Sequence, residues 1–209
     1  MLPVGSGDRA LIVGRDPHFA EDLRRDGVTV LCVDDWLSLP PDAPEQPGFG
    51  HVFVPELTGE HRAHDLADLG RVVRPGGGLF LGVPHRLRSR SPGATTAARG
   101  GRALKRAGFT DIDVYGLRHG LAEPRELVPL GSPQVMAWYL ASIYRPQPGG
   151  ELRGAARSTR MLRTRILVVA LGPNGIRSRA LVDLLARSPL PQLLFSALGF
   201  VARRGGREC

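Results

Sequence analysis

The chain has few cysteines, one lysine and no hydrophobic run long enough to cross a membrane. A membrane-spanning helix needs about 18 or more consecutive apolar residues, and no apolar run here is that long. The first eight residues have neither the basic region nor the apolar core of a secretion signal. We therefore expect a cytoplasmic protein that does not enter a membrane.

Metal sites and hydrolase sites also lack a signal in this sequence. Its two cysteines are Cys32, within an apolar stretch, and Cys209, the C-terminal residue, so they predict neither a disulfide framework nor a metal site. The H-E-x-x-H, C-x-x-C, P-loop and G-x-S-x-G motifs are absent. We expect no bound metal ion.

Positive charge is abundant, and nearly all of it comes from arginine. The net charge is +8 and the pI is near 10.8, values that are typical of nucleic-acid-binding proteins. Lys105 is the only lysine, however, and the arginines are scattered among many Ala, Gly and Pro residues, which indicates a GC-rich coding genome. We expect no specific nucleic-acid partner. The densest run, 153–165, is either a solvated or interface surface or a site for an anionic substrate.

Short apolar runs alternate with amphipathic segments, which predicts a single α/β domain with a mostly parallel sheet. With 209 residues, 42% of them hydrophobic, the chain is long and apolar enough for one well-buried core. The predicted strands are 10–14, 28–33, 51–57, 79–83 and 109–115. The predicted helices are 19–27, 59–73, 95–107, 133–144 and 177–186.

The segment 66–84 is the most informative part of the chain. It has the pattern of an amphipathic helix, a Pro-Gly-Gly-Gly turn at 75–78 and a buried strand at 79–83. Pro75 cannot continue a helix, and glycine permits the positive φ angles of a tight turn. The run 79–83 is typical of a central parallel strand that is covered on both faces.

The sequence of this segment, RVVRPGGGLFLGVP at 71–84, resembles the helix–PGG–strand segment of class I S-adenosylmethionine-dependent methyltransferases. Residues 103–115 resemble the start of that family's sixth strand, and 197–204 resembles its last strand, which is antiparallel. The resemblance covers roughly 9–120 and 195–205. It implies a doubly wound, mostly parallel sheet that ends in an antiparallel strand.

The same resemblance implies that residues 117–194 form a helical insertion within a single domain 1–209. The family commonly joins its last two strands by a short hairpin, whereas this chain places predicted helices between them. An insertion of this size normally has a purpose. It could cap the active site, form a homodimer or bind a carrier or partner protein, and a homodimer is the expectation.

Ligands of doubly wound sheets bind at the carboxyl ends of the strands. The resemblance implies a glycine-rich turn after the first strand and an acid after the second that accepts hydrogen bonds from the ribose hydroxyls. Trp36 could stack on the adenine, and Glu56 follows a strand at the same edge. The residues expected to bind S-adenosylmethionine are Gly14, Asp16, Asp34, Asp35, Trp36 and Glu56. The alternatives are solvated or capping carboxylates and, for Trp36, core packing.

Two departures from the family pattern keep a second interpretation open. Arg15 and Pro17 stand where small residues are usual, and Arg15 adds positive charge next to a ligand whose sulfonium is itself positive. The interval between Asp35 and the strand at 51 is too short for the usual helix and third strand. One β/α unit is therefore short or missing, or the strand 28–33 stands for the third strand, in which case Asp35 would face the adenine.

Methyl transfer depends mainly on aligning the acceptor with the methyl group, and an oxygen or nitrogen acceptor also needs a general base. His85, His119 and His61 each follow a predicted strand at the edge where a base is needed, and His85 is the first choice. For each of them the alternative is an ordinary surface histidine.

Together these features predict an S-adenosylmethionine-dependent methyltransferase acting on a small molecule, in specialised metabolite biosynthesis. The alternative is a methyltransferase-like protein that no longer methylates and serves as a structural or regulatory partner.

Overall fold

The computed structural model describes residues 5–14, 16–35, 48–57, 63–86, 94–118, 121, 126–143, 184–188 and 190–206. Several residues and segments singled out above lie outside the described residues. They are Arg15, Trp36, His61, His119, Cys209 and the run 153–165.

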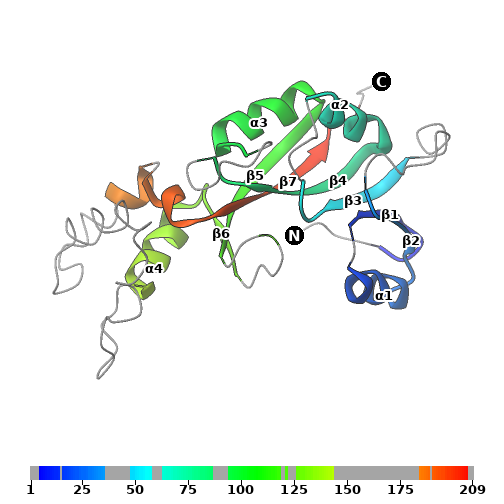
Figure 1. The fold of residues 1–209 in the computed structure, drawn as a ribbon, viewed down its shortest axis with the longest axis horizontal. Coiled ribbons are helices and arrows are strands. Elements are labelled where there is room, and N and C mark those ends of the chain that lie inside the picture. Colours follow the sequence, from blue (N-terminus) through cyan, green and yellow to red (C-terminus); the bar gives the residue numbers. More distant parts are fainter. Residues whose placement is uncertain are drawn as a thin grey trace.

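Seven strands form one mixed sheet in the order β2-β1-β3-β4-β7-β5-β6 (Figure 1). The strands are β1 (Arg9–Val13), β2 (Thr29–Val33), β3 (Phe49–Val54), β4 (Val73–Pro84), β5 (Phe109–Arg118), β6 (Glu126–Pro129) and β7 (Ala197–Arg204). The helices are α1 (Pro17–Arg25), α2 (Ala63–Val72), α3 (Ala97–Arg106), α4 (Pro133–Ile143) and the 3₁₀-helix η4 (Leu190–Leu194).

The strand directions confirm the predicted fold class. The pairs β1–β2, β1–β3 and β3–β4 are parallel. The strand β7 is antiparallel to both of its neighbours, β4 and β5. The structure is thus an α/β fold with a mixed seven-stranded sheet and an antiparallel last strand, as the resemblance implied.

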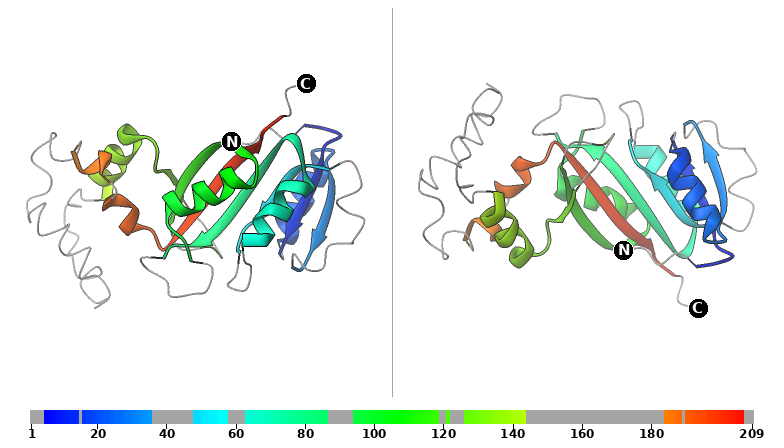
Figure 2. Two further views of the ribbon diagram at one scale, coloured as in Figure 1. Left: turned by 90° about the horizontal axis from the view of Figure 1, so that it is seen from above. Right: turned by 90° about the horizontal axis from the view of Figure 1, so that it is seen from below.

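The parallel strands β1, β3 and the second half of β4 are largely buried, which explains why they are almost continuously apolar, while β2 at the end of the sheet is only partly buried. Leu11 and Val13 of β1 belong to the cluster that contains Leu69 of α2 and Leu104 of α3. The alternate residues of β1 pack instead against α1, in a second cluster with Ala20 and Leu23. Figure 2 shows α2 and α3 on one face of the sheet and α1 on the other.

The Pro-Gly-Gly-Gly segment 75–78 lies inside a strand, which corrects the prediction of a helix-to-strand turn. The helix α2 ends at Val72, and β4 begins at Val73, which pairs with Phe49 of β3. The register of this pairing shifts between Phe49 and His51, whose partner is Gly78. The segment therefore forms an irregularity in β4, and Gly76 takes a φ of 75° within it.

The second half of the chain adds a hairpin strand that the sequence analysis did not predict. The strand β6 pairs antiparallel with β5, and β5 itself continues to Arg118, beyond the predicted end at residue 115. The helix α4 follows, close to the predicted range 133–144. Its buried residues pack in a separate cluster in which the rings of Tyr139 and Phe195 stack 5.5 Å apart. Among the described residues, no helix is long and apolar enough to cross a membrane.

Glycines inside α2 and α3 allow these helices to lie close to their neighbours. A Cβ atom at Gly70 would lie 2.4 Å from the carbonyl oxygen of Ala107. A Cβ atom at Gly100 would lie 2.4 Å from the ring of Phe200 in β7. Glycine costs helix stability, so its presence in both helices follows from these close contacts.

Adjacent glycines of α3 provide a matched pair of substitutions. We expect Gly100→Ala to destabilise the protein by about 1–3 kcal/mol, because the methyl group would overlap the Phe200 ring. We expect Gly101→Ala to stabilise it by about 0.5–1 kcal/mol, because no described atom lies within 4 Å of a Cβ there and alanine is the better helix former. Urea unfolding of both variants measures the two effects, and equal stabilities would contradict this packing of α3 on β7.

Candidate functional site

The carboxyl ends of β1, β2, β3 and β4 lie along one edge of the sheet, because these strands are parallel. We call this edge the carboxyl rim. The residues that follow the four strands there are Gly14, Asp34, Pro55 and His85. Ligands of open α/β sheets bind at this end of the strands, so a cofactor site is expected along this rim.

Gly14 makes an open turn at the end of β1. Its φ of 113° lies in the region that side chains rarely adopt, and its N–H donates a hydrogen bond to the carbonyl oxygen of Val33, 2.8 Å away. No described atom lies within 4 Å of a Cβ built at this position. The turn therefore ties the end of β1 to the end of β2 and leaves its backbone accessible to a ligand.

The residues after this turn begin α1. The carboxylate of Asp16 caps the helix by accepting a hydrogen bond from the backbone N–H of Phe19, at 3.0 Å. Pro17 occupies the first turn of α1, where a missing N–H costs the helix nothing. The unusual Pro17 thus has a local structural reason, since it helps to start a short helix immediately after the strand.

An open pocket of about 580 Å³ lies at the junction of β1, α1 and β2. It contains three of the predicted residues, Gly14, Asp16 and Asp34, whereas Asp35 and Glu56 are not among its lining residues. The sequence analysis did not select the other lining residues, which are Pro17, Ala20, Arg24, Cys32 and Val33.

Two of these unselected residues are neighbours on α1 and β2. The guanidinium Nη2 of Arg24 lies 3.9 Å from the Sγ of Cys32, and both residues are exposed. Both fall within segments that the sequence analysis assigned to a helix and a strand, and their periodic pattern gave no indication that they share a pocket. The pocket therefore carries a thiol and a cation as well as two carboxylates.

Glu56 is held at the carboxyl rim by the backbone around it. The N–H of Leu57 donates to the carbonyl oxygen of Gly82, at 2.8 Å. A Cβ atom at Gly82 would lie 2.0 Å from the carbonyl oxygen of Pro55, so only glycine allows this approach. Glu56 is exposed between these anchored neighbours, and its predicted role in binding the cofactor stays a prediction.

His85 lies at the end of β4 but is completely buried. Its Nδ1 lies 3.1 Å from the carbonyl oxygen of Phe195, and its backbone N–H donates to the carbonyl oxygen of Ser196. A bridge to Thr95 completes its contacts with the chain that leads into α3. In this position His85 connects β4 to the residues before β7 and before α3. Its role as a general base, which requires contact with the substrate, stays a prediction.

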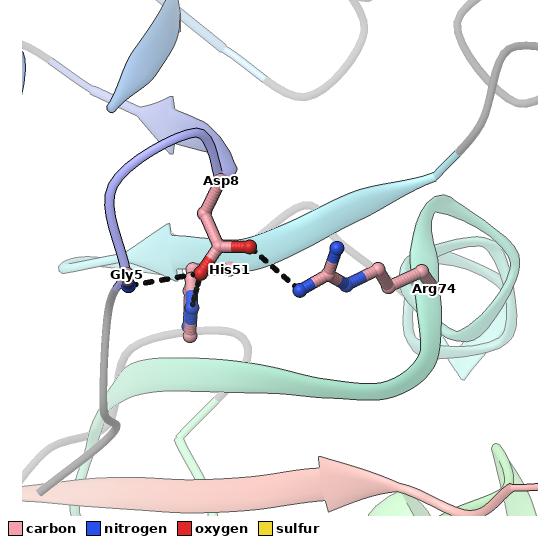
Figure 3. A network of polar contacts seen from close by, with 4 residues as sticks. All are labelled: Gly5, Asp8, His51 and Arg74. Atoms are coloured by element: carbon pink, nitrogen blue, oxygen red, sulfur yellow. Dashed lines mark hydrogen bonds and ion pairs between the residues drawn. The ribbon is translucent and has the colours of Figure 1, made fainter. Parts of the chain in front are cut away.

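A second polar cluster lies near the amino ends of the parallel strands, opposite the carboxyl rim, and the sequence analysis missed it. Asp8 accepts a hydrogen bond from the N–H of Gly5 at 2.9 Å, lies 3.2 Å from the Nε2 of His51 and forms an ion pair with Arg74 at 2.6 Å (Figure 3). His51 is 5% exposed. One carboxylate thus links the residues before β1 to β3 and to β4.

This environment lowers the pKa of the Asp8 carboxyl. The hydrogen bond from the Gly5 N–H has the largest effect, and partial burial opposes it. The contacts with His51 and Arg74 lower the pKa further. Among the described residues, no group of three or more His, Cys, Asp or Glu side chains is arranged to hold a metal ion.

The parallel strands and the helices on both faces of the sheet make this an α/β protein, and an open pocket lies at its carboxyl rim. No model of a known protein family matches the chain, and no curated protein sequence matches it.

The chain is similar to several solved methyltransferase structures. One is phosphoethanolamine N-methyltransferase 2 of Haemonchus contortus, bound to phosphomonomethylethanolamine and S-adenosylhomocysteine (14% identity, TM-score 0.47, 98% of this chain covered). The chain spans only 50% of the length of that enzyme.

Two others are S-adenosylmethionine-dependent methyltransferases. The one from Archaeoglobus fulgidus has 12% identity and a TM-score of 0.49, with 94% of this chain and 86% of that chain covered. The one from Mesorhizobium loti has 14% identity and a TM-score of 0.47, with 97% and 94% covered. At these identities the likeness concerns the fold alone.

The Asp8 cluster predicts a dependence of stability on pH. Because the folded-state pKa of Asp8 is lowered, its stabilisation is present above the unfolded-state pKa of about 4 and is lost as the pH falls through the folded-state value. We expect Asp8→Asn to lower the free energy of unfolding by about 1–3 kcal/mol at pH 7 and to weaken its decline below pH 4.

Urea unfolding from pH 3 to pH 7 measures both effects. Asp22→Asn is the control, because the Asp22 carboxylate is 68% exposed and its ion pair with Arg25 lies on the surface of α1. Identical pH profiles for the Asp8 variant and the unsubstituted protein would contradict the role of this carboxylate.

Proposed function

We propose that the protein is an S-adenosylmethionine-dependent methyltransferase that acts on a small molecule and works in the cytoplasm, with its cofactor in the pocket between α1 and β2. The observation that supports this most is the composition of that pocket. An accessible glycine turn and the two carboxylates Asp16 and Asp34 meet at the ends of adjacent parallel strands.

The residues present fit an adenosyl ligand. A carboxylate can accept hydrogen bonds from both hydroxyls of a ribose, and Asp34 follows β2 at the pocket wall. The open space beside Gly14 lets the ligand approach the backbone closely. Asp16 adds a second negative charge near a ligand that carries a positive sulfonium.

S-adenosylmethionine supplies an activated methyl group when it is bound. The chain itself has to align the acceptor with that group and, for an oxygen or nitrogen acceptor, to take up a proton. Glu56 is exposed at the same rim, and contact with substrate or cofactor remains its proposed role. His85, His61 and His119 remain the proposed bases, and specialised metabolite biosynthesis remains the proposed setting.

A second candidate is a methyltransferase-like protein that binds a ligand or partner without methylating it. The observation that favours this candidate is the start of α1. Pro17 has no N–H to offer a ligand, and the carboxylate of Asp16 already accepts the N–H of Phe19. In this case the pocket would bind S-adenosylhomocysteine or another adenosyl compound but would transfer no methyl group.

Adjacent acids at the end of β2 provide a matched test of the cofactor site. We expect Asp34→Asn to weaken the binding of S-adenosylhomocysteine by about tenfold or more, because a charge-assisted hydrogen bond contributes about 1.5–3 kcal/mol. Asp35→Asn should change the affinity by about twofold or less, because Asp35 is not among the residues that line the pocket. Isothermal titration calorimetry measures both affinities.

The outcomes separate the two candidates. No binding to the folded, unsubstituted protein would overturn both the cofactor and the methyltransferase proposal. Binding that depends on Asp34, with no methyl transfer from labelled S-adenosylmethionine to any of a panel of small-molecule acceptors, would favour the protein that binds without methylating.

We further propose that residues 117–194 form an insertion that joins two copies of the chain. This part of the molecule exposes large apolar side chains, among them Trp138 and Val135 on α4 and Leu184 further along the chain. Exposed apolar surface of this kind is typical of a protein–protein contact. Docking of a carrier or partner protein is the other use proposed for this surface.

A change at the most exposed of these side chains tests the homodimer. Trp138 is 70% exposed, so Trp138→Glu should leave the fold intact and convert a dimer into a monomer in light scattering. Ala98→Glu, at an exposed position of α3, introduces the same charge elsewhere and should leave the dimer unchanged. A monomeric mass for the unsubstituted protein at high concentration would overturn the dimer.

A further inference from the structure

The outer face of α3 carries four positive side chains and no acidic one. Arg99, Arg102, Lys105 and Arg106 are all exposed, whereas Leu104 on the other side of the helix is completely buried. Arg99, Arg102 and Arg106 follow one another at spacings of three and four residues and therefore share one face. We call this surface the α3 basic face. The helix lies along the outer side of the sheet (Figure 1).

The cations of this face have no acidic partner among the described residues, whereas Arg25 of α1 and Arg71 of α2 have one. On α1, Arg25 pairs with Glu21 and Asp22, and on α2, Arg71 pairs with Asp68. Among the described residues, no ion pair or hydrogen bond links the side chain of an α3 cation to an acid. Within the part of the chain that the structure describes, the α3 basic face therefore presents positive charge without an acidic partner.

Helix stability does not account for this arrangement. Lys105 and Arg106 lie in the last turn, where cations stabilise a helix through its dipole. Arg99 lies in the first turn, which contains no acidic residue. A cation near a helix N-terminus is repelled by the dipole. The position of Arg99 thus costs the helix some stability and indicates a use outside it.

The composition of the face favours phosphates over a protein partner. A protein–protein interface has an apolar core, often with aromatic residues, and the large exposed apolar side chains of the described residues lie on β6, α4 and residues 184 and 190, not on α3. Small alanines and glycines separate the α3 cations. Proteins that bind nucleic acid without reading its sequence use lysine and arginine to neutralise the backbone phosphates.

We propose that the α3 basic face binds the phosphodiester backbone of nucleic acid without reading its sequence. From Arg99 to Arg106 the helix rises about 10 Å, and the phosphates of one strand follow one another about every 3.4 Å along the axis of a DNA duplex, so the face is long enough to reach several of them. Arginine can contact a phosphate through two parallel hydrogen bonds. This binding is independent of the pocket at the carboxyl rim and of the reaction proposed for it.

The test measures how salt affects binding. A fluorescein-labelled 20-base-pair DNA duplex of arbitrary sequence is titrated with the protein at several NaCl concentrations, and anisotropy gives the Kd. The logarithm of the affinity should fall linearly with the logarithm of the salt concentration. Each phosphate contact contributes about 0.9 to the slope.

Two triple variants that each remove three positive charges form the matched pair. In the first, Arg99→Gln, Arg102→Gln and Arg106→Gln remove the three arginines of the α3 basic face and leave Lys105, and glutamine keeps the helix propensity. In the second, Arg86→Gln, Arg187→Gln and Arg203→Gln remove three exposed arginines from other parts of the surface. Circular dichroism and thermal unfolding verify that both variants are folded.

We expect the α3 variant to reduce the slope by about 2–3 and to raise the Kd at 50 mM NaCl by about tenfold or more. The control variant should change the slope by less than about 1. Equal losses in the two variants would show diffuse attraction to the net charge and would overturn the site, as would an unchanged slope in the α3 variant.

A labelled polyglutamate 20-mer is titrated in parallel. Its binding should be weaker than that of DNA at equal salt concentration. If polyglutamate bound more tightly than DNA and the α3 variant lost this binding, the ligand of the α3 basic face would be an acidic protein segment. That result would overturn the proposal.

Discussion

The sheet depends on the insertion of β7 between β4 and β5. This strand forms antiparallel ladders with both neighbours, and it connects the parallel half of the sheet to the hairpin of β5 and β6. Three of its residues are completely buried in the hydrophobic cluster that also contains Leu69 of α2 and Leu104 of α3. They are Leu198, Phe200 and Ala202. Arg204 at its end donates hydrogen bonds to the carbonyl oxygens of Arg71 and Val73, where α2 gives way to β4. The strand β7 therefore ties the junction of α2 and β4 to the hairpin that follows α3.

The position of β7 also constrains the elements around it. The ring of Phe200 fills the space beneath α3 and requires Gly100, and Phe195 before the strand requires Gly116 in β5. His85 at the end of β4 bonds to the backbone of the same region. The carboxyl end of β4 is thus held by residues distant in sequence, while the ends of β1 and β2 form the more open pocket. At the end of β4 the carboxyl rim is closed by packing, whereas at the ends of β1 and β2 it is open to a ligand.

Local sequence patterns predicted most of the helices and strands and the sides that they bury. Most of what the sequence analysis missed depends on contacts between residues that are distant in the sequence. The apolar runs at β1 and β4 identified these strands, because burial on both faces leaves a continuous pattern. The apolar run at β2 identified a strand that is only partly buried. The start of β4 was assigned wrongly, since the pairing of Val73 with Phe49 has no local signal. Asp8 before β1 meets His51 of β3 and Arg74 of β4, and no spacing along the chain indicates this contact. In the pocket, Gly14, Asp16 and Asp34 could be selected from strand ends, whereas Arg24 and Cys32 could not.

The place of β7 in the sequence has a consequence for biosynthesis. A ribosome makes every other described element before it makes β7. Until then the edges of β4 and β5 that β7 will occupy are open to pairing with other chains. A nascent chain that has folded its parallel half would expose these two edges, and exposed edges of this kind promote aggregation. Translation that stops before residue 197 should therefore yield a product that needs chaperones, even though most of the residues of the sheet are already present.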